Sequence, residues 1–206
     1  GVFNWGNEGT SQVTLTNCTI SGNTVTAAGG NATAGGLASY AEVDGTAVIN
    51  LVNCTISGNT ATNAANAGGL FSGVEDAGST ADINLKNTIL ANNSNTQALA
   101  GADATITSQG NNLASDNAGG FLTGSGDLTN TNPLLATLAN YGGTTQTYAL
   151  LPGSPAINAG TSSGAPTNDQ RGKLRFGATD IGAFESQGFS LAIASGSPQS
   201  AVVNTN

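Results

Sequence analysis

The amino-acid sequence predicts an all-β solenoid, in which the chain winds through stacked coils of short strands. Three observations point to this class. One stretch occurs three times, at residues 13–24, 49–60 and 83–94. Its apolar residues alternate along the chain, as they do in a strand that buries one face. A second marker, Gly-Gly-Leu, occurs at 35–37 and returns 33 residues later at 68–70. Repeats too small to bury their own apolar face indicate copies that stack on one another.

Each copy predicts two short strands that meet at an asparagine corner. In the first copy, Val13 and Leu15 alternate as inward positions, but the next apolar residues are Cys18 and Ile20, one residue out of phase. A slip of one residue would turn the side chains inside out in a straight strand, so the chain has to bend at Asn17. A third strand in each coil is expected at Gly-Gly-Leu-Ala-Ser-Tyr40 and at Gly-Gly-Leu-Phe-Ser72.

Stacking in register predicts columns of identical residues. Three parallel strands per coil make a right-handed single-stranded parallel β-helix, with the handedness taken from the general rule for parallel crossovers. At about 4.8 Å between coils, Leu15, Leu51 and Leu85 should lie over one another. Two asparagine columns are expected to pass amide hydrogen bonds between coils and to occupy left-handed corners: Asn17, Asn53 and Asn87, and then Asn23, Asn59 and Asn93.

Cys18 and Cys54 occupy the same position in neighbouring copies, and Thr88 takes that position in the third. A disulfide between adjacent coils is within reach of stacked Cα atoms. Side chains on in-register parallel strands, however, point the same way rather than at each other. Since cysteine also packs as a small hydrophobe, two free buried thiols are the favoured interpretation.

Composition limits the classes of partner. Charged residues make up 8% of the 206, against a usual value of about 25%. Twelve acidic and four basic residues give a net charge of −8, which argues against nucleic acid and anionic lipid as partners. No apolar run approaches the roughly 20 residues of a membrane span, so direct membrane insertion is not expected. The sequence has no His and two Cys, which disfavours imidazole catalysis and a zinc site.

No cofactor is expected, and calcium is the one metal to consider. Glu42 and Asp44 follow the first Gly-Gly-Leu, Glu75 and Asp76 follow the second, and Asp82 is near in sequence. Carboxylates stacked on one edge would repel one another unless joined by a cation such as Ca²⁺, which takes six to eight oxygen ligands. The favoured alternative is a pair of solvated loops with screened charges.

The chain divides into three segments. Residues 1–130 hold the coils, the last of them imperfect and closed by Phe121, Leu122 and Leu128. Residues 131–186 differ in composition, and their leucines and isoleucines are expected to cap the last coil. Within this cap, Arg171 is expected to form a partly buried ion pair with Asp180 or Glu185, in a stabilising role. Residues 187–206 form a tail or linker.

The cap segment carries a family likeness. It contains Asn132-Pro-Leu-Leu-Ala, Asn140-Tyr-Gly-Gly-Thr-Thr-Gln-Thr-Tyr148, Leu151-Pro-Gly-Ser-Pro-Ala-Ile-Asn-Ala-Gly160, Asp169-Gln-Arg-Gly172 and Asp180-Ile-Gly-Ala-Phe-Glu185. Together these motifs closely resemble the C-terminal signature of the choice-of-anchor Q domain family. The likeness covers about residues 1 to 186. It implies a bacterial surface or extracellular protein with an upstream parallel β-helix of the pectin-lyase-like type, and it implies no general catalytic activity.

The two ends of the chain suggest assembly. Residues 1–6 resemble a Gly-Gly-Leu strand of an incomplete coil, and residues 188–206 resemble the opening strands of a bacterial immunoglobulin-like domain. Strand addition between copies, head to tail, would build a filament. Flanking domains of a longer surface protein are the other candidate partners. The residues expected at such contacts are Val2, Phe3, Trp5, Phe189, Leu191, Ile193, Val202 and Val203.

These observations predict a non-enzymatic structural or adhesive element of the bacterial cell surface. One alternative is a polysaccharide-binding module, which gains weight only if several of Trp5, Tyr40, Tyr141 and Tyr148 are exposed along one groove. The less favoured alternative is a polysaccharide lyase or hydrolase. A lyase needs a carboxylate cluster with calcium and a basic residue, and the only basic residue in the repeats is Lys86.

Overall fold

The computed structural model describes residues 1–26, 34–62 and 66–189, and in these ranges the protein is all-β with parallel sheets. Sheet A contains β1 (Val2–Asn7), β5 (Leu37–Glu42), β9 (Leu70–Val74) and β12 (Ala98–Ala100). Sheet B contains β2 (Thr10–Thr16), β6 (Thr46–Val52), β10 (Thr80–Lys86) and β13 (Ala104–Ser108). Sheet C contains β3 (Thr19–Ser21), β7 (Thr55–Ser57), β11 (Ile89–Ala91) and β14 (Leu113–Ala114).

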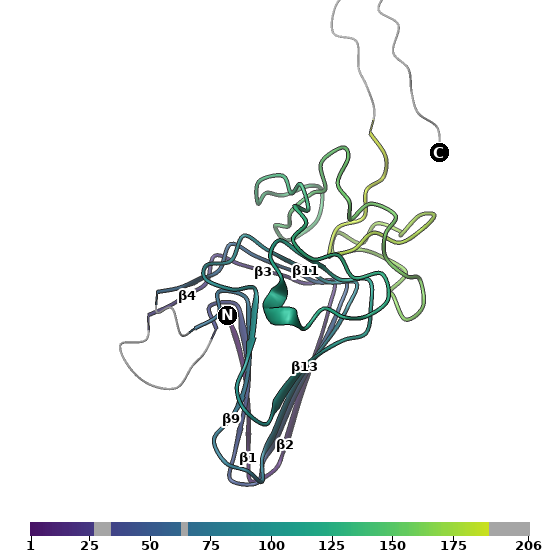
Figure 1. The fold of residues 1–206 in the computed structure, drawn as a ribbon. Coiled ribbons are helices and arrows are strands. Elements are labelled where there is room, and N and C mark those ends of the chain that lie inside the picture. Colours follow the sequence, from purple (N-terminus) through teal and green to yellow (C-terminus); the bar gives the residue numbers. More distant parts are fainter. Residues whose placement is uncertain (27–33, 63–65, 190–206) are drawn as a thin grey trace, which may run out of the picture.

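The chain passes through sheets A, B and C in turn and then returns to sheet A, so each circuit adds one strand to each sheet. One circuit is called a coil below. Seen nearly along the stack, the coils overlie one another and outline a wedge, with sheet C across its wide end (Figure 1). A small fourth sheet, β4 (Thr24–Val25) with β8 (Thr60–Ala61), projects from the end of sheet C. The arrangement is consistent with a β-helix solenoid, as the repeats predict.

The register of the strands confirms the predicted columns. Leu15 and Leu85 both lie opposite Leu51, and Val13 and Ile83 both lie opposite Ile49. These side chains point into the wedge and form one core with the inward residues of sheets A and C. The strands that begin at the Leu of each Gly-Gly-Leu also pair as expected, with Val2 and Leu70 both opposite Leu37. Parallel in-register stacking therefore buries a continuous apolar column that no single repeat could bury alone.

The first corner lies between sheets B and C, where the predicted asparagine bend is found. Asn17, Asn53 and Asn87 have φ of 53°, 49° and 49°, and Asn111 continues the column with φ of 54°. These values lie in the left-handed region, which asparagine tolerates better than most residues.

The second corner differs from the expectation. There the left-handed residue stands just before the column asparagine: Gly22, Gly58 and Asn92, with φ of 70°, 73° and 55°. Asn23, Asn59 and Asn93 themselves avoid positive φ. Glycine, or asparagine in the third copy, makes the turn because it can adopt this conformation at low cost. The asparagine that follows, such as Asn59 after Gly58, can then point its side-chain amide into the coil.

Asn23, Asn59 and Asn93 form the coil-to-coil ladder that was expected. The side-chain amide of Asn23 donates to the Oδ1 of Asn59, and that of Asn59 donates to the Oδ1 of Asn93, both at 2.9 Å. The amide of Asn59 also donates to the Ile20 carbonyl, and Asn93 donates onward to the Oε1 of Gln97. Asn59 is only 1% exposed. The ladder thus satisfies polar groups of the turns inside the coil, where water is excluded.

The last coil is closed by residues that follow β14. The short 3-10 helix η1 (Ala118–Gly120) lies within the wedge in the view along the stack (Figure 1). Ala118 and Leu122 belong to the main core, and Phe121 packs against it. Leu128 pairs with Leu113 of β14. Phe121 and Leu122 therefore close the interior as predicted, whereas Leu128 extends sheet C and packs its side chain on the outer face of that sheet. In the described ranges, no helix is long and apolar enough to cross a bilayer.

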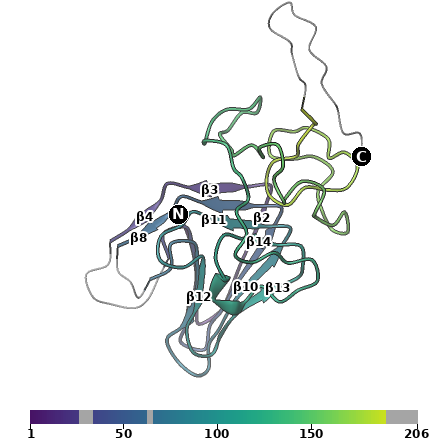
Figure 2. The same cartoon turned by 45° about the horizontal axis from the view of Figure 1, so that its top comes forward.

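Residues 131–186 differ from the expected end cap, because they lie along the outer face of sheet C rather than over the last coil (Figures 1 and 2). Outward-facing Ile89, Ala91 and Leu113 form a second apolar cluster with residues of this segment. The contributing side chains include Leu150, Ala156, Ile181 and Phe184. Both faces of β11 are apolar, so its outer face needs a cover of its own. We call residues 131–186 the flank segment.

Replacing Asn59 with Ala should lower the free energy of unfolding by about 3 kcal/mol, because the truncation leaves several buried donors and acceptors without partners. Asn50→Ala is the matched control. Asn50 accepts a hydrogen bond from Asn84 on the outer face of sheet B, where water can replace it, and we expect a loss below about 1 kcal/mol. Urea unfolding measures both values. Equal losses would contradict a special role for the inward ladder.

Candidate functional site

The flank segment is held by the asparagines of the first corner, whose amides point out of the coils. Asn17, Asn53, Asn87 and Asn111 each donate to a backbone carbonyl of this segment, those of Asn168, Asp180, Thr161 and Ala159 respectively. The predicted coil-to-coil bond in this column occurs once, from Asn87 to Asn53 at 3.2 Å. One asparagine per coil therefore serves both as a turn residue and as an attachment point.

Two buried ion pairs lie in the flank segment. Arg175 contacts Glu185 at 2.8 Å, with side chains 5% and 1% exposed. Arg171 contacts Asp169 at 2.6 Å, with side chains 7% and 0% exposed. The expected partner of Arg171 was Asp180 or Glu185, so the pairing differs: the carboxylate belongs to Asp169 in the same turn. Arg171 does reach Glu185, but through its backbone carbonyl.

Asp180 has a separate role in the flank segment. Its two carboxylate oxygens accept hydrogen bonds from the backbone N–H groups of Asn158 and Ser186. Burial raises the pKa of Asp180 to about 6, and these hydrogen bonds oppose part of that rise. The carboxyl group therefore ties together three parts of the flank segment while it remains partly desolvated.

Cys18 and Cys54 are free thiols, as the favoured interpretation predicted. Cys54 is buried, whereas Cys18 is only partly buried because it lies in the first coil. A hydrogen bond from the Cys54 thiol holds the pKa of Cys18 below its ordinary value. The same contact, together with burial, raises the pKa of Cys54. The two side chains act as one packed pair in the column that Thr88 continues.

The five acidic residues considered for calcium do not gather into a site. Among the described residues, no group of three or more His, Cys, Asp or Glu side chains is placed to hold a metal ion. Asp82 lies within β10 of sheet B rather than in the loops after sheet A, and it accepts a hydrogen bond from the hydroxyl of Thr105. Glu42, Glu75 and Asp76 accept from Asn7, the Tyr40 hydroxyl and the Val43 N–H respectively, and Asp44 is exposed. These five carboxylates therefore do not supply the clustered oxygen ligands that Ca²⁺ requires.

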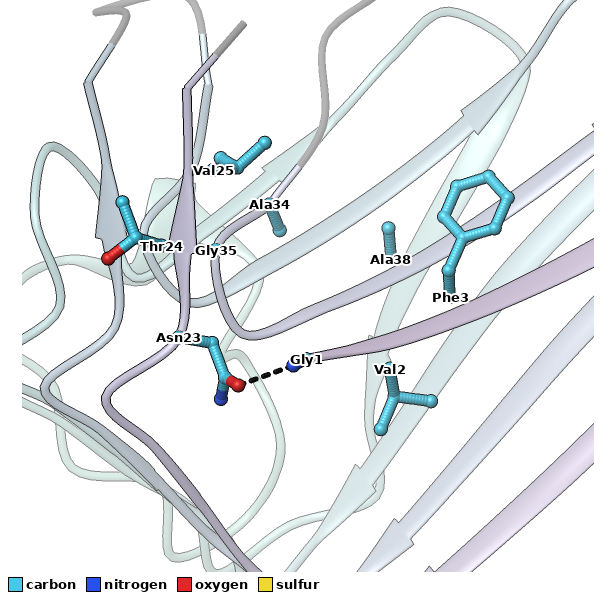
Figure 3. A pocket seen from close by; sticks show the side chains of 9 residues that line it. All are labelled: Gly1, Val2, Phe3, Asn23, Thr24, Val25, Ala34, Gly35 and Ala38. Carbon is cyan, nitrogen blue, oxygen red and sulfur yellow. Dashed lines mark hydrogen bonds between the residues drawn. The ribbon is translucent and has the colours of Figure 1, made fainter.

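A groove of about 300 Å³ runs between β4 and the outer face of sheet A (Figure 3). Thr24 and Val25 of β4 line one side, and Phe3 and Ala38 of sheet A line the other. Its remaining wall is formed by small or polar residues: Gly1, Val2, Asn23, Ala34 and Gly35. Because the side chain of Ala38 is only a methyl group, the groove is open above it, and the ring of Phe3 forms the adjoining rim of the groove.

Aromatic side chains continue from this groove across the outer face of sheet A. Phe3 is 62% exposed and Trp5 is 51% exposed. The rings of Phe3 and Tyr40 lie 6.5 Å apart at an interplanar angle of 26°. Trp5 lies opposite Tyr40 in the register of β1 and β5, so all three side chains share one face. These three residues are called the aromatic platform below.

The other residues singled out from the sequence lie elsewhere. Tyr141 packs edge-on against Phe184, and the Tyr148 hydroxyl bonds Ser21, so both contribute to the flank junction. Val2, expected at an assembly contact, packs against the core, while Phe189 is exposed. Leu191, Ile193, Val202 and Val203 lie outside the described residues.

No family model, curated protein or solved structure matches this chain. The candidate site therefore rests on geometry: a groove, three aromatic rings on one exposed sheet face, and a flank junction built from buried polar contacts. The signal for the aromatic platform was present in the sequence as Phe3 and Trp5, two residues apart on one strand, with Tyr40 aligned in the next copy.

Replacing Arg175 with Met should loosen the flank segment, because Glu185 would remain buried without its charge partner, a change that costs about 3 to 5 kcal/mol. We expect faster limited proteolysis within residues 131–186, with the cleavage sites mapped by mass spectrometry. Lys173→Met is the control, since Lys173 is exposed. Similar cleavage rates in the two variants would argue against the ion pair as an anchor.

Asp180 should make stability depend on pH in an unusual direction. Its folded pKa of about 6 lies above the ordinary 3.8, so the folded chain binds this proton more tightly than the unfolded chain. The stabilising contribution is full below about pH 3.8 and is lost as pH rises through about 6. We expect the Tm of the parent chain relative to that of Asp180→Asn to fall between roughly pH 4 and pH 7.

Asp103→Asn is the control for this pH series, because Asp103 is exposed. Its Tm difference from the parent chain should stay nearly constant over the same range. A difference for Asp180→Asn that does not change with pH, or that changes in the opposite direction, would show that Asp180 does not titrate in this window.

Proposed function

We propose that this chain is a right-handed parallel β-helix of the choice-of-anchor Q type and serves as a non-enzymatic structural or adhesive element of the bacterial cell surface. One observation carries the proposal: the buried polar and charged side chains bind the coils and the flank segment to one another. Asn59, Arg175 and Glu185 are examples, each enclosed and engaged with other parts of the chain. Buried polar groups that hold parts of the chain together, rather than facing an open site, favour a structural role over a catalytic one.

The chemistry of a polysaccharide lyase is not favoured by this arrangement. Abstraction of a proton beside a uronate carboxylate needs a basic group and a cation at one place. Two of the four basic residues, Arg171 and Arg175, are enclosed in ion pairs. Lys86 shares the outer face of sheet B with a single carboxylate, that of Asp82, while Glu42 lies on sheet A. The described residues therefore do not bring a cation-binding carboxylate cluster and a basic group to one place.

Association through strand edges is the second candidate, with copies of this chain or flanking domains of a longer protein as partner. In the described part of the chain, β1, β2, β3 and β4 are each the end strand of their sheet. Their outer edges carry backbone groups that another strand could pair with. Sedimentation velocity separates the two partners, because only self-association makes the sedimentation coefficient rise with concentration.

The proposed function predicts that incubation with polygalacturonate, alginate or neutral glucans releases no product. Unsaturated products are followed by ultraviolet absorbance and new reducing ends by a colorimetric assay, with and without added Ca²⁺. A catalytically active pectate lyase serves as the positive control. Product release that is abolished by heating the sample to unfold the chain would overturn the proposal in favour of an enzyme.

A further inference from the structure

We infer that the groove beside β4 and the aromatic platform of Phe3, Trp5 and Tyr40 together bind a neutral polysaccharide chain. This inference rests on the proposed function and names its ligand class. It begins from a contrast between the three outer faces of the coil stack. Sheet C is covered by the flank segment. The outer face of sheet B presents threonine, asparagine, glutamine and other non-aromatic residues such as Val48 and Lys86.

The aromatic platform offers exposed ring surface of the kind that a sugar ring packs against. A pyranose ring presents an axial face of C–H groups, which packs against the flat face of an aromatic ring. The rings of Phe3 and Tyr40 are stacked nearly parallel, with 26° between their planes, and Trp5 lies beside Tyr40 on the neighbouring strand β1. Large apolar groups left exposed together on one face commonly mark a binding site.

Polar groups stand at both ends of the platform. Asn7, two residues beyond Trp5, donates to the Oε1 of Glu42 and is exposed. The groove lies at the other end, where Thr24 presents an exposed hydroxyl. The outward side chains from Phe3 to Asn7 span about 13 Å of strand, and the groove extends this track past Phe3. Such a track accommodates several sugar units and offers hydrogen-bond partners for their hydroxyl groups.

The charge of this face selects among polysaccharides. Glu42 and Glu75 adjoin the platform, and none of the four basic residues lies on β1, β4, β5 or β9. A uronate polymer would therefore meet like charge beside the platform, whereas a neutral glycan would meet hydrogen-bonding groups and aromatic rings. A second copy of this chain is disfavoured as the occupant, because the same acidic rows would approach each other.

Affinity gel electrophoresis tests the inference, with hydroxyethylcellulose and glucomannan as neutral probes and polygalacturonate as the anionic probe. We expect a neutral probe to retard the parent chain and polygalacturonate to leave its migration unchanged. Trp5→Ala and Tyr40→Ala should each raise the dissociation constant about tenfold or more. Tyr40→Phe keeps the ring and should retain most of the binding.

Phe176→Ala is the matched control, since Phe176 is 79% exposed on the flank segment. It should bind like the parent chain. Thermal melting of each variant separates lost binding from lost folding, and Trp5 is exposed enough for its truncation to leave Tm nearly unchanged. The inference is overturned if neither neutral probe retards the chain, if only polygalacturonate does, or if Trp5→Ala binds normally. It is also overturned if Trp5→Ala abolishes concentration-dependent dimers of the chain and leaves polysaccharide binding unchanged. None of these outcomes involves product release, which would overturn the proposed function instead.

Discussion

The inward ladder of Asn23, Asn59 and Asn93 is the constraint on which the rest of the structure depends. Each repeat contains two corners, and these corners bring backbone N–H and C=O groups into the interior. The strands of the sheets cannot supply hydrogen-bond partners for all of these groups. Asn59 donates both to Asn93 and to the Ile20 carbonyl of the preceding coil, and Asn93 donates to the Ile56 carbonyl in the same way. A shift of one residue between coils would break both contacts and turn the apolar column outward. The ladder thus sets the register that aligns the outer faces.

Much of the fold was predictable because a repeated sequence shows which residues align. Equivalent positions, such as Leu15 and Leu51, need only one assumption, stacking in register, to become neighbours in space. The second corner was harder to predict, since Ser-Gly-Asn contains two residues that tolerate left-handed φ. The glycine makes the turn because the amide of Asn59 has to point into the coil to reach Asn93.

The position of the flank segment could not be predicted from the sequence. This segment contains no repeat, so nothing aligned its leucines with a particular surface, and an end cap was as compatible with its composition as a lateral cover. Similarly, Arg171 had three nearby carboxylates in sequence, and the choice of Asp169 depends on the shape of the turn. The aromatic platform was predicted in part: Trp5 and Tyr40 were identified as stacking residues, while Phe3, and also Trp5, were assigned to assembly contacts. Which aromatic residues remain exposed depends on where the flank segment lies.

The lateral course of the flank segment has a mechanical consequence. Its contacts with Asn17, Asn53, Asn87 and Asn111 join four successive coils to one strap. A load applied beyond residue 186 and directed along the stack reaches these contacts in parallel, so that several must rupture together. A load directed away from sheet C reaches them one after another, as in peeling. Resistance of the flank segment to tension would then differ with the direction of the load.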